Sequence, residues 1–355
     1  MAQMSLRPCG DFRTTYRQDK TIFDTRNSRV AMAIFLVFAF MGPLYLDPYQ
    51  MSLAIQICYY GIAALGLNIL VGFTGQISLG HAAFFGFGAF SSAWLNNTTG
   101  IPVFLTVPLA GLMTTAVGLF FGAPAARIKG LYLAIATLAS QFILEDFLVR
   151  AEWFTGGSSG SPAGPVSLFG FELNNDGRYY IFALAWCVVM YILGANLMRS
   201  RDGRAFVAVR DHYLSAEVMG INLAKYRILS FGISSFFAGI GGALYAHYLG
   251  FVSAEGFTIL LSIQFLGMII IGGLGSVMGS MMGTVFMVLL PEAMKMLADG
   301  MQAMGDIPSL RDNLDFLREM SIGMAIILFL VFEPDGLAHR WRLVKSYWKL
   351  YPFSY

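Results

Sequence analysis

Ten runs of apolar residues divide the chain, and polar segments of different lengths separate them. Most runs contain about 20 residues, the length that an α-helix needs to cross a bilayer core about 30 Å thick. The runs occupy residues 30–46, 51–71, 81–95, 101–122, 131–149, 179–198, 228–249, 258–271, 277–296 and 320–332. This pattern predicts an all-α polytopic membrane protein with about ten transmembrane segments, in one transmembrane domain over residues 30–332.

One polar segment, residues 199–227, is rich in cations and lies between two apolar runs. It holds six of the 23 Lys and Arg residues of the chain. Short basic loops remain on the cytoplasmic side of a membrane, so this segment fixes the topology around it. Its inner part, residues 204–220, contains no Pro and is expected to form a short helix along the membrane face.

The distribution of cations favours a topology with both termini in the cytoplasm. If the first run starts inside and the runs alternate, 18 of the 23 Lys and Arg residues fall in inside segments, and five fall at or near the outer side. That asymmetry follows the positive-inside rule. We therefore expect cytoplasmic tails at residues 1–29 and 333–355, the second of them basic, and a long outer loop without regular structure at residues 150–178.

Two runs, residues 81–95 and 258–271, are too short for ordinary membrane crossings. Each lies beside a glycine-rich break, VGFTGQISLG at 71–80 and IGGLGSVMG at 271–279. Paired short segments interrupted by glycine are typical of broken helices that line a pathway. Unpaired backbone is tolerated at membrane depth only where protein or a water-filled cavity satisfies it. The similar spacing of Gly and Ser in the two breaks also suggests a distant internal duplication.

The breaks and the second short run supply the predicted pathway residues. Uncharged polar groups there offer the donors and acceptors that a permeating solute needs. The predicted pathway residues are Thr74, Gln76, Ser78, His81, Gln264, Gly273, Gly275 and Ser276. His81 has an alternative role as a hydrogen-bonded packing residue. Helix packing alone explains the small-residue rows Gly275, Gly279, Gly283 and Gly239, Gly242, Ala243.

The composition indicates a membrane protein without a metal site. Hydrophobic residues make up 57% of the chain and charged residues 12%, about half the charged fraction of soluble domains, and the mean hydropathy is +0.64. The three cysteines, Cys9, Cys58 and Cys187, are too few and too scattered for a disulfide framework or a zinc site. The four histidines do not have metal-ligand spacing either.

Charge and motifs argue against a proton-driven carrier and against an enzyme. Glu145, Asp146 and Glu292 lie within about two helical turns of the predicted outer boundary, where solvated positions are expected, so no intramembrane charge relay is present. No HExxH, GxSxG or GxxxxGK[ST] motif in the required setting occurs. We expect no enzymatic activity and no cofactor, and an ATPase that drives this protein would be a separate chain.

Several segments resemble a known family. They are LGLNILVGFTGQISLGHAAFFGFGAF at 65–90, KGLYLAIATLA at 129–139, Trp153 with TGGSSG at 155–160, GRAFVAVRDHYLSAEVMGIN at 203–222, SFFAGIGGALYAHYLGFVSAEGFT at 235–258, IIGGLGSVMGSMMGTVF at 270–286 and EPDGL at 333–337. In this combination the chain resembles the LivM-like permease subunits of ABC importers for branched-chain amino acids. Permeases for urea and short-chain amides are similar.

The resemblance implies a heteromeric importer in the bacterial inner membrane. Its partners would be a second, LivH-like permease, two ABC ATPase subunits, an extracytoplasmic solute-binding protein and membrane lipid, with no nucleic acid. Segment 199–227 would be the coupling loop for the ATPases. The residues matched in that loop are Arg204, Arg210, Asp211, Glu217 and Gly220, and those matched in the outer loop are Trp153, Gly156, Gly157 and Ser158.

The chain departs from the family at a few positions, and the sequence leaves the substrate and one alternative class of transporter undecided. His212 and Tyr213 stand where the family more often has acidic residues or Asn, and Ser159 and Ser161 depart from the usual outer-loop residues. The substrate is a branched-chain amino acid, urea, a short-chain amide or another amino acid. A stand-alone ion-driven carrier is the alternative from a different class, and it requires transport by this chain alone.

Overall fold

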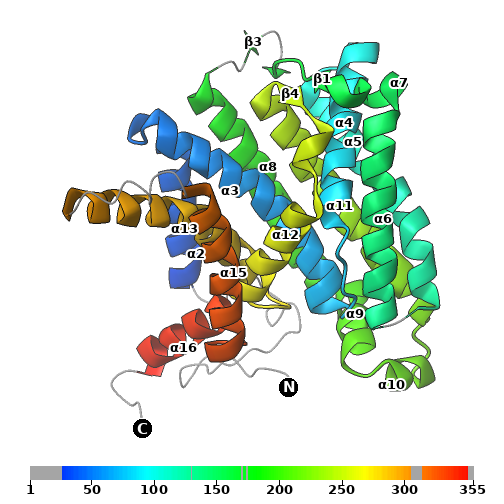
Figure 1. Cartoon of the computed structure of the whole chain (residues 1–355). Helices are drawn as coiled ribbons and strands as arrows, with labels where there is room; N and C mark the ends of the chain where they lie inside the picture. The colour runs from blue at the N-terminus through cyan, green and yellow to red at the C-terminus, as the bar shows by residue number, and fades with distance from the viewer. Residues whose placement is uncertain (1–25, 129, 169–170, 173–174, 305–313, 351–355) are drawn as a thin grey trace.

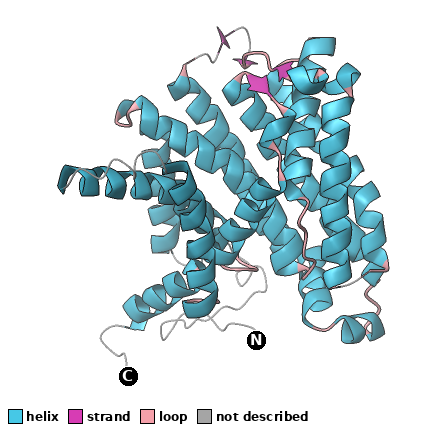
Figure 2. Cartoon of the chain, in the orientation of Figure 1, coloured by secondary structure: helices cyan, strands magenta, loops and turns pink. Residues whose placement is uncertain are grey.

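A computed structural model describes residues 26–128, 130–168, 171–172, 175–304 and 314–350 (Figure 1). Helices dominate, and short strands lie at one end (Figure 2). The helices are α2 (Arg26–Phe40), α3 (Pro48–Asn68), α4 (His81–Thr99), α5 (Val103–Gly122), α6 (Leu131–Arg150), α7 (Glu152–Thr155), α8 (Asp176–Arg199), α9 (Arg201–Asp211), α10 (Tyr213–Val218), α11 (Leu223–Leu249), α12 (Ile259–Gly272), α13 (Val277–Met304), α15 (Leu314–Phe332) and α16 (Leu337–Leu350). The predicted all-α class is confirmed.

Each of the ten apolar runs falls on a helix, but fewer helices meet the requirements of a crossing. Within the described residues, seven helices are long and apolar enough, and the bent pair α15–α16, with a 50° angle, is an eighth candidate. The apolar part of α2 is short, Val30–Phe40. The other exception is α4, which runs four residues past the predicted end at 95 through the polar sequence Asn96–Thr99. The count of ten therefore stays a prediction.

Helix α11 lies at the centre and packs against α3, α4 and α5 (Figure 1). Small residues allow this close approach: a Cβ atom at Gly88 of α4 would collide with the backbone of Gly239, and one at Gly242 would collide with the carbonyl oxygen of Phe85. In the same way, a Cβ at Gly283 of α13 would strike the backbone of α12. The predicted packing role is confirmed for Gly239, Gly242 and Gly283, whereas Gly275 lies in the break before α13 and not on a helix face. Apolar burial gives helices in lipid little reason to associate, so close backbone contact contributes much of the cohesion.

The outward faces of the peripheral helices carry large apolar side chains, as a lipid environment requires. Examples are Leu112 and Phe120 of α5, Leu131 of α6 and Ile327 of α15, all exposed. A soluble protein rarely exposes so much contiguous apolar surface. The chain is therefore a multi-pass membrane protein.

Two polar regions have more regular structure than the sequence predicts. The loop at 150–178, expected to be irregular, contains α7 and the short strands β1 (Ser161–Pro162), β2 (Ser167–Leu168) and β3 (Phe171–Glu172). Strand β1 pairs antiparallel with β4 (Phe251–Val252), and β2 pairs with β3. Residues 337–350 of the predicted tail form α16. Most of the predicted N-terminal tail lies outside the described residues. In Figure 1, α9 and α10 lie at the end opposite to α7, β1 and β4.

Candidate functional site

The first glycine-rich break begins where α3 loses its regular hydrogen bonding. Residues Ile69–Phe73 form a π-helical turn, a rare feature that is frequent at functional sites. The hydroxyl group of Thr74 donates to the carbonyl oxygen of Leu70 (2.7 Å) and ends the turn. Gly75 follows with φ of 70°, a left-handed conformation that favours glycine. Residues 76–80 then run without a helix or strand to the start of α4.

The second break, residues 273–276 between α12 and α13, is joined to the first by Asn68. The Oδ1 atom of Asn68 accepts the backbone N–H of Gly275 (2.9 Å). Its Nδ2 donates to the carbonyl oxygen of Ser276 (2.8 Å) and to the Oγ of Ser280 (2.7 Å). The Asn68 side chain is fully buried. One side chain therefore satisfies backbone groups that the break leaves without helical partners, as membrane depth requires.

Arg210, at the end of α9, reaches the same junction from the 199–227 segment. Its Nη1 donates to the carbonyl oxygen of Gly72 (2.6 Å), and its Nη2 lies 2.8 Å from the Oδ1 of Asp211. Glycine is needed on both sides: a Cβ at Gly72 would collide with the backbone nitrogen of Gly275, and a Cβ at Gly275 would lie 2.9 Å from the Arg210 Nη1. The structure thus brings Arg210 together with both breaks.

Three other predicted residues of the 199–227 segment, Arg204, Glu217 and Gly220, lie outside this junction. Arg204 donates to the carbonyl oxygen of Arg199 (3.1 Å), and Glu217 is exposed. Gly220 follows α10 with φ of 83°. The single helix expected over 204–220 is wrong, because His212 interrupts it and caps α10, its Nδ1 accepting the backbone N–H of Ser215 (3.3 Å). Two short helices therefore replace one.

The N-terminus of α4 is capped by side chains from two other helices. The backbone N–H of Ala82 donates to the Oγ of Ser262 in α12 (2.9 Å), and that of Ala83 donates to the Oε1 of Gln141 in α6 (3.0 Å). These are two of the N–H groups that a helix start leaves without partners. His81 is buried, and its Nε2 contacts the carbonyl oxygen of Ala63 (2.9 Å). This contact fits the alternative role of His81, that of a hydrogen-bonded packing residue, rather than a role in the pathway.

The other polar residues of the first break face α11. The Nε2 of Gln76 donates to the Oγ of Ser230 (2.7 Å), one helical turn from Ser234. The Oε1 of Gln76 and the hydroxyl groups of Ser78 and Ser234 are buried without a partner in the described part of the chain. Buried polar atoms are nearly always hydrogen-bonded. This side of the break is therefore polar, but its hydrogen bonding is incomplete.

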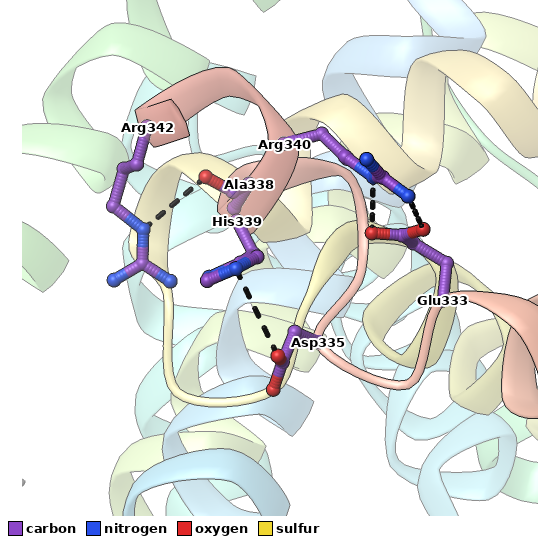
Figure 3. Close-up of polar contacts among 6 residues, drawn as sticks. All are labelled: Glu333, Asp335, Ala338, His339, Arg340 and Arg342. Carbon is purple, nitrogen blue, oxygen red and sulfur yellow. Dashed lines mark hydrogen bonds and ion pairs between the residues drawn. The ribbon is translucent and has the colours of Figure 1, made fainter. Parts of the chain in front are cut away.

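A third turn, residues 333–336 between α15 and α16, packs on the second break. A Cβ at Gly273, which has φ of 113°, would lie 2.9 Å from the carbonyl oxygen of Asp335. The turn is held by an ion pair between Glu333 and Arg340 and by a contact of 3.9 Å between Asp335 and His339 (Figure 3). The Arg340 guanidinium lowers the pKa of the Glu333 carboxyl below its ordinary value. The EPDGL motif therefore supports the junction of the two breaks.

Two groups of predicted site residues lie elsewhere. Trp153 is exposed on α7, and Gly156 and Gly157 follow it with positive φ values of 75° and 67°, before Ser158 in the next short turn. They belong to the strand-bearing end of the molecule, opposite to α9 (Figure 1). Gln264 lines a separate cavity between α3, α12, α13 and α15.

Sequence reasoning missed Asn68, Gln141 and Ser262, which lie inside runs that read as apolar. A usable signal was present. Asn68 and Gln141 are isolated carboxamides in runs that otherwise consist almost entirely of apolar and small residues. A polar side chain inside a membrane segment is costly unless it has a partner, so a lone amide there predicts a specific contact.

Helices broken at glycines and joined through buried polar groups are typical of membrane transporters. The comparisons with known proteins agree. Residues 50–330 match the family model "Branched-chain amino acid transport system / permease component", and the chain belongs to this family. It is a permease subunit of an ABC importer, and its relatives are transport subunits rather than enzymes.

Three relatives indicate the range of the family. The chain is 29% identical to the high-affinity branched-chain amino acid transport system permease protein LivM of Salmonella typhimurium, over 88% of this chain and 75% of that protein. It is 26% identical to a probable LivM of Methanocaldococcus jannaschii, over 81% and 88% of the two chains. The autoinducer 2 import system permease protein LsrC of Salmonella typhi is 23% identical, over 78% and 81%. No solved structure matches the chain.

Proposed function

We propose that this chain imports branched-chain amino acids across the bacterial inner membrane as one of two permeases in a complex. A LivH-like permease forms the other half of the pathway, two ABC ATPases bind the cytoplasmic side, and an extracytoplasmic binding protein delivers the substrate. The names of the LivM relatives support the substrate. The cation asymmetry of the sequence supports cytoplasmic termini and a cytoplasmic 199–227 segment.

The contact between Arg210 and Gly72 is the observation that carries the coupling mechanism. Helices α9 and α10 together form a compact unit in the 199–227 segment, and an ATPase can bind to this unit. When the ATPases close, α9 moves as a rigid body. Arg210 then pulls on the Gly72 carbonyl, at the point where α3 has already left regular helical bonding. Movement of the loop thus reaches both breaks through one side chain.

The experiment compares Arg210→Ala with Arg201→Ala in the complete complex, reconstituted in liposomes. Arg201 is exposed on the same helix and does not contact the break. Its substitution therefore removes the same positive charge from the loop and leaves the contact between Arg210 and Gly72 in place. We expect Arg210→Ala to lower ATP-driven leucine uptake at least about tenfold, because a charge-assisted hydrogen bond to a buried carbonyl is lost. ATP hydrolysis should continue. Arg201→Ala should retain most uptake.

Three outcomes would contradict parts of this proposal. Unchanged uptake in Arg210→Ala would show that this contact does not couple the loop to the breaks. Equal losses in the two variants would assign the effect to ATPase docking. A wild-type complex that takes up urea but not leucine, isoleucine or valine would overturn the substrate.

A further inference from the structure

A cavity of about 270 Å³ lies between α3, α12, α13 and α15, remote from the junction of the breaks. Its volume is near the lower end of the range for small-molecule sites. Along α3, Gln56 in the cavity wall and Gly72 in the first break are separated by about 24 Å of helix. In the topology of the proposed function, the cavity belongs to the outer half of the membrane domain.

The cavity contains one acid and one base on the same helix face. Glu292 and Lys295 are three residues apart on α13, with the Lys295 Nζ 3.0 Å from the Glu292 Oε1. The Glu292 side chain is only 18% exposed, so it is less solvated than its place near the end of the apolar run 277–296 suggests. Tyr49 lines the same cavity, with its hydroxyl group close enough to the Glu292 carboxylate to interact with it. Ionisable residues inside membrane segments are costly, and a functional role is the first hypothesis for them.

Further polar groups around the pair have capacity for a ligand. The side-chain amides of Gln56 and Gln264 line the cavity, and neither has a hydrogen-bond partner among the described residues. Pro291 lies inside α13 and has no N–H to donate, so the carbonyl oxygen of Met287, four residues earlier, loses its helical partner. Both of these residues also line the cavity.

The cavity is also lined by the apolar side chains of Leu53, Met268 and Val288, which lie one helical turn from Gln56, Gln264 and Glu292, respectively. A small site with a paired acid and base and with apolar side chains beside them matches one chemical class. A zwitterionic amino acid carries an ammonium and a carboxylate close together, and an apolar side chain projects from the carbon between them.

We propose that this cavity binds a zwitterionic amino acid with an apolar side chain during its passage through the importer. Glu292 accepts hydrogen bonds from the ammonium, Lys295 and Tyr49 donate to the carboxylate, and the side chain packs against Leu53, Met268 and Val288. Binding exchanges one ion pair within the protein for two with the ligand, and the net charge of the site stays at zero. Urea or an amide has no charges to replace the broken pair. The inference rests on the proposed function for the direction of transport and for the amino-acid cargo.

The test uses the complete importer in liposomes at saturating binding protein. We expect Glu292→Gln and Lys295→Gln each to lower leucine uptake about tenfold or more, since each removes a charge-assisted hydrogen bond to the ligand. The exchange Glu292→Lys with Lys295→Glu should recover part of the uptake, because both charges remain on the same face. Stimulation of ATP hydrolysis by the loaded binding protein should stay within about twofold of wild type.

Asp146 and Arg150 form the matched control. They are also an acid and a base on one helix face, 2.7 Å apart, but both are exposed on α6, outside the cavity. Asp146→Asn and Arg150→Gln should leave uptake unchanged. Equal losses from the control pair and the cavity pair would overturn the inference.

A second measurement is independent of transport. In a variant with the native cysteines replaced by alanine, Gln56→Cys places a thiol in the cavity wall. We expect millimolar leucine to slow its alkylation, while 4-methylpentanoate, which has no ammonium, and isoamylamine, which has no carboxylate, do not. No protection by leucine would overturn the inference.

The outcomes separate the two proposals. Unchanged uptake in Glu292→Gln and Lys295→Gln would overturn the cavity inference alone. If these variants instead lose the second permease on purification, the cavity is a subunit contact and the inference is wrong. A wild-type complex without amino-acid uptake would overturn the proposed function, whatever the cavity variants do.

Discussion

Helix α3 connects two regions that handle buried polar groups in opposite ways. At its C-terminal end, the backbone of two breaks is tightly packed, and Asn68 and Arg210 satisfy the freed carbonyl and N–H groups. Toward its N-terminal end, α3 borders an open cavity with an ion pair and two amides that have no partner in the described part of the chain. The backbones of the first region are held together by glycines that leave no space, whereas the second region keeps an open space lined by polar groups.

This difference shows how one polypeptide provides both a closure and a site for a solute. A closed part of a transport pathway needs close backbone contact and few unpaired hydrogen-bond donors, so that neither water nor solute passes. A site for a solute needs a concave space with a few convergent polar groups. Because both regions share α3, α12 and α13, movement at one end of these helices changes the distances at the other.

The largest effect is expected from filling the contact between the breaks. Gly72→Ala places a Cβ against the Gly275 nitrogen and the Asn68 side chain, so the two breaks must move apart. We expect a loss of about 3 kcal/mol in the free energy of unfolding, the upper part of the range for overpacking. Thermal unfolding of the purified protein in detergent measures it.

Gly323→Ala is the matched control for that change. Gly323 lies inside α15, and a Cβ atom there meets no other atom within 4 Å. Alanine is the better helix former, so this variant should be equally or slightly more stable. Equal destabilisation by the two substitutions would show that the breaks are not closely packed.

The next effect tests Asn68 as the link between the breaks. Asn68→Ala leaves the partly buried Gly275 N–H without its partner, which costs about 2 kcal/mol. Asn97→Ala is the control, because the Asn97 amide also donates to a backbone carbonyl, that of Pro162 (2.7 Å), but at an exposed site. Chemical unfolding curves should separate the two variants. Similar midpoints would contradict the role given to Asn68.

The sequence predicts the two breaks and the 199–227 segment, but it does not predict the contacts between them. The breaks were found because glycine clusters beside short apolar runs are a local signal. The 199–227 segment was found from its cations. The hydrogen bond between Arg210 and Gly72 was not predicted, because 138 residues separate them and no local sequence pattern indicates a contact between distant segments.

Expectations based on distance from a helix end were less accurate. Glu292 was expected to be solvated because it lies near the end of an apolar run. Its side chain is instead 18% exposed, because α3, α12 and α15 together with α13 enclose the cavity. The end of α4 was placed too early, because Asn and Thr interrupt the apolar pattern. Yet the hydroxyl groups of Thr98 and Thr99 bond to carbonyl groups four residues earlier, which keeps the helix intact.

A smaller effect is expected from an uncharged cavity residue. Gln264→Leu removes one amide that faces the ligand position, and leucine uptake by the complete complex should fall about fivefold, the equivalent of one ordinary hydrogen bond of about 1 kcal/mol. The neighbouring Ile263 is exposed on the outside of α12, so Ile263→Leu should have no effect. Stability should be the same in both variants. A parallel loss of stability in Gln264→Leu would assign Gln264 to packing instead.

The smallest effect concerns the turn at 333–336, which supports the closed region from outside. Arg340 lowers the pKa of the Glu333 carboxyl below its ordinary value of 4.5. A carboxyl with a lowered pKa in the folded state adds stability above its ordinary pKa, and this contribution is lost as the pH falls through the lowered value. Glu333→Gln should therefore reduce the melting temperature slightly at pH 7, and the difference from wild type should disappear as the pH falls through the lowered pKa of the Glu333 carboxyl. Glu145→Gln, at the other end of the molecule, should have the wild-type melting temperature at pH 7. A constant difference between Glu333→Gln and wild type from pH 7 to pH 3 would show that the ion pair contributes nothing and that only the shape of the side chain matters.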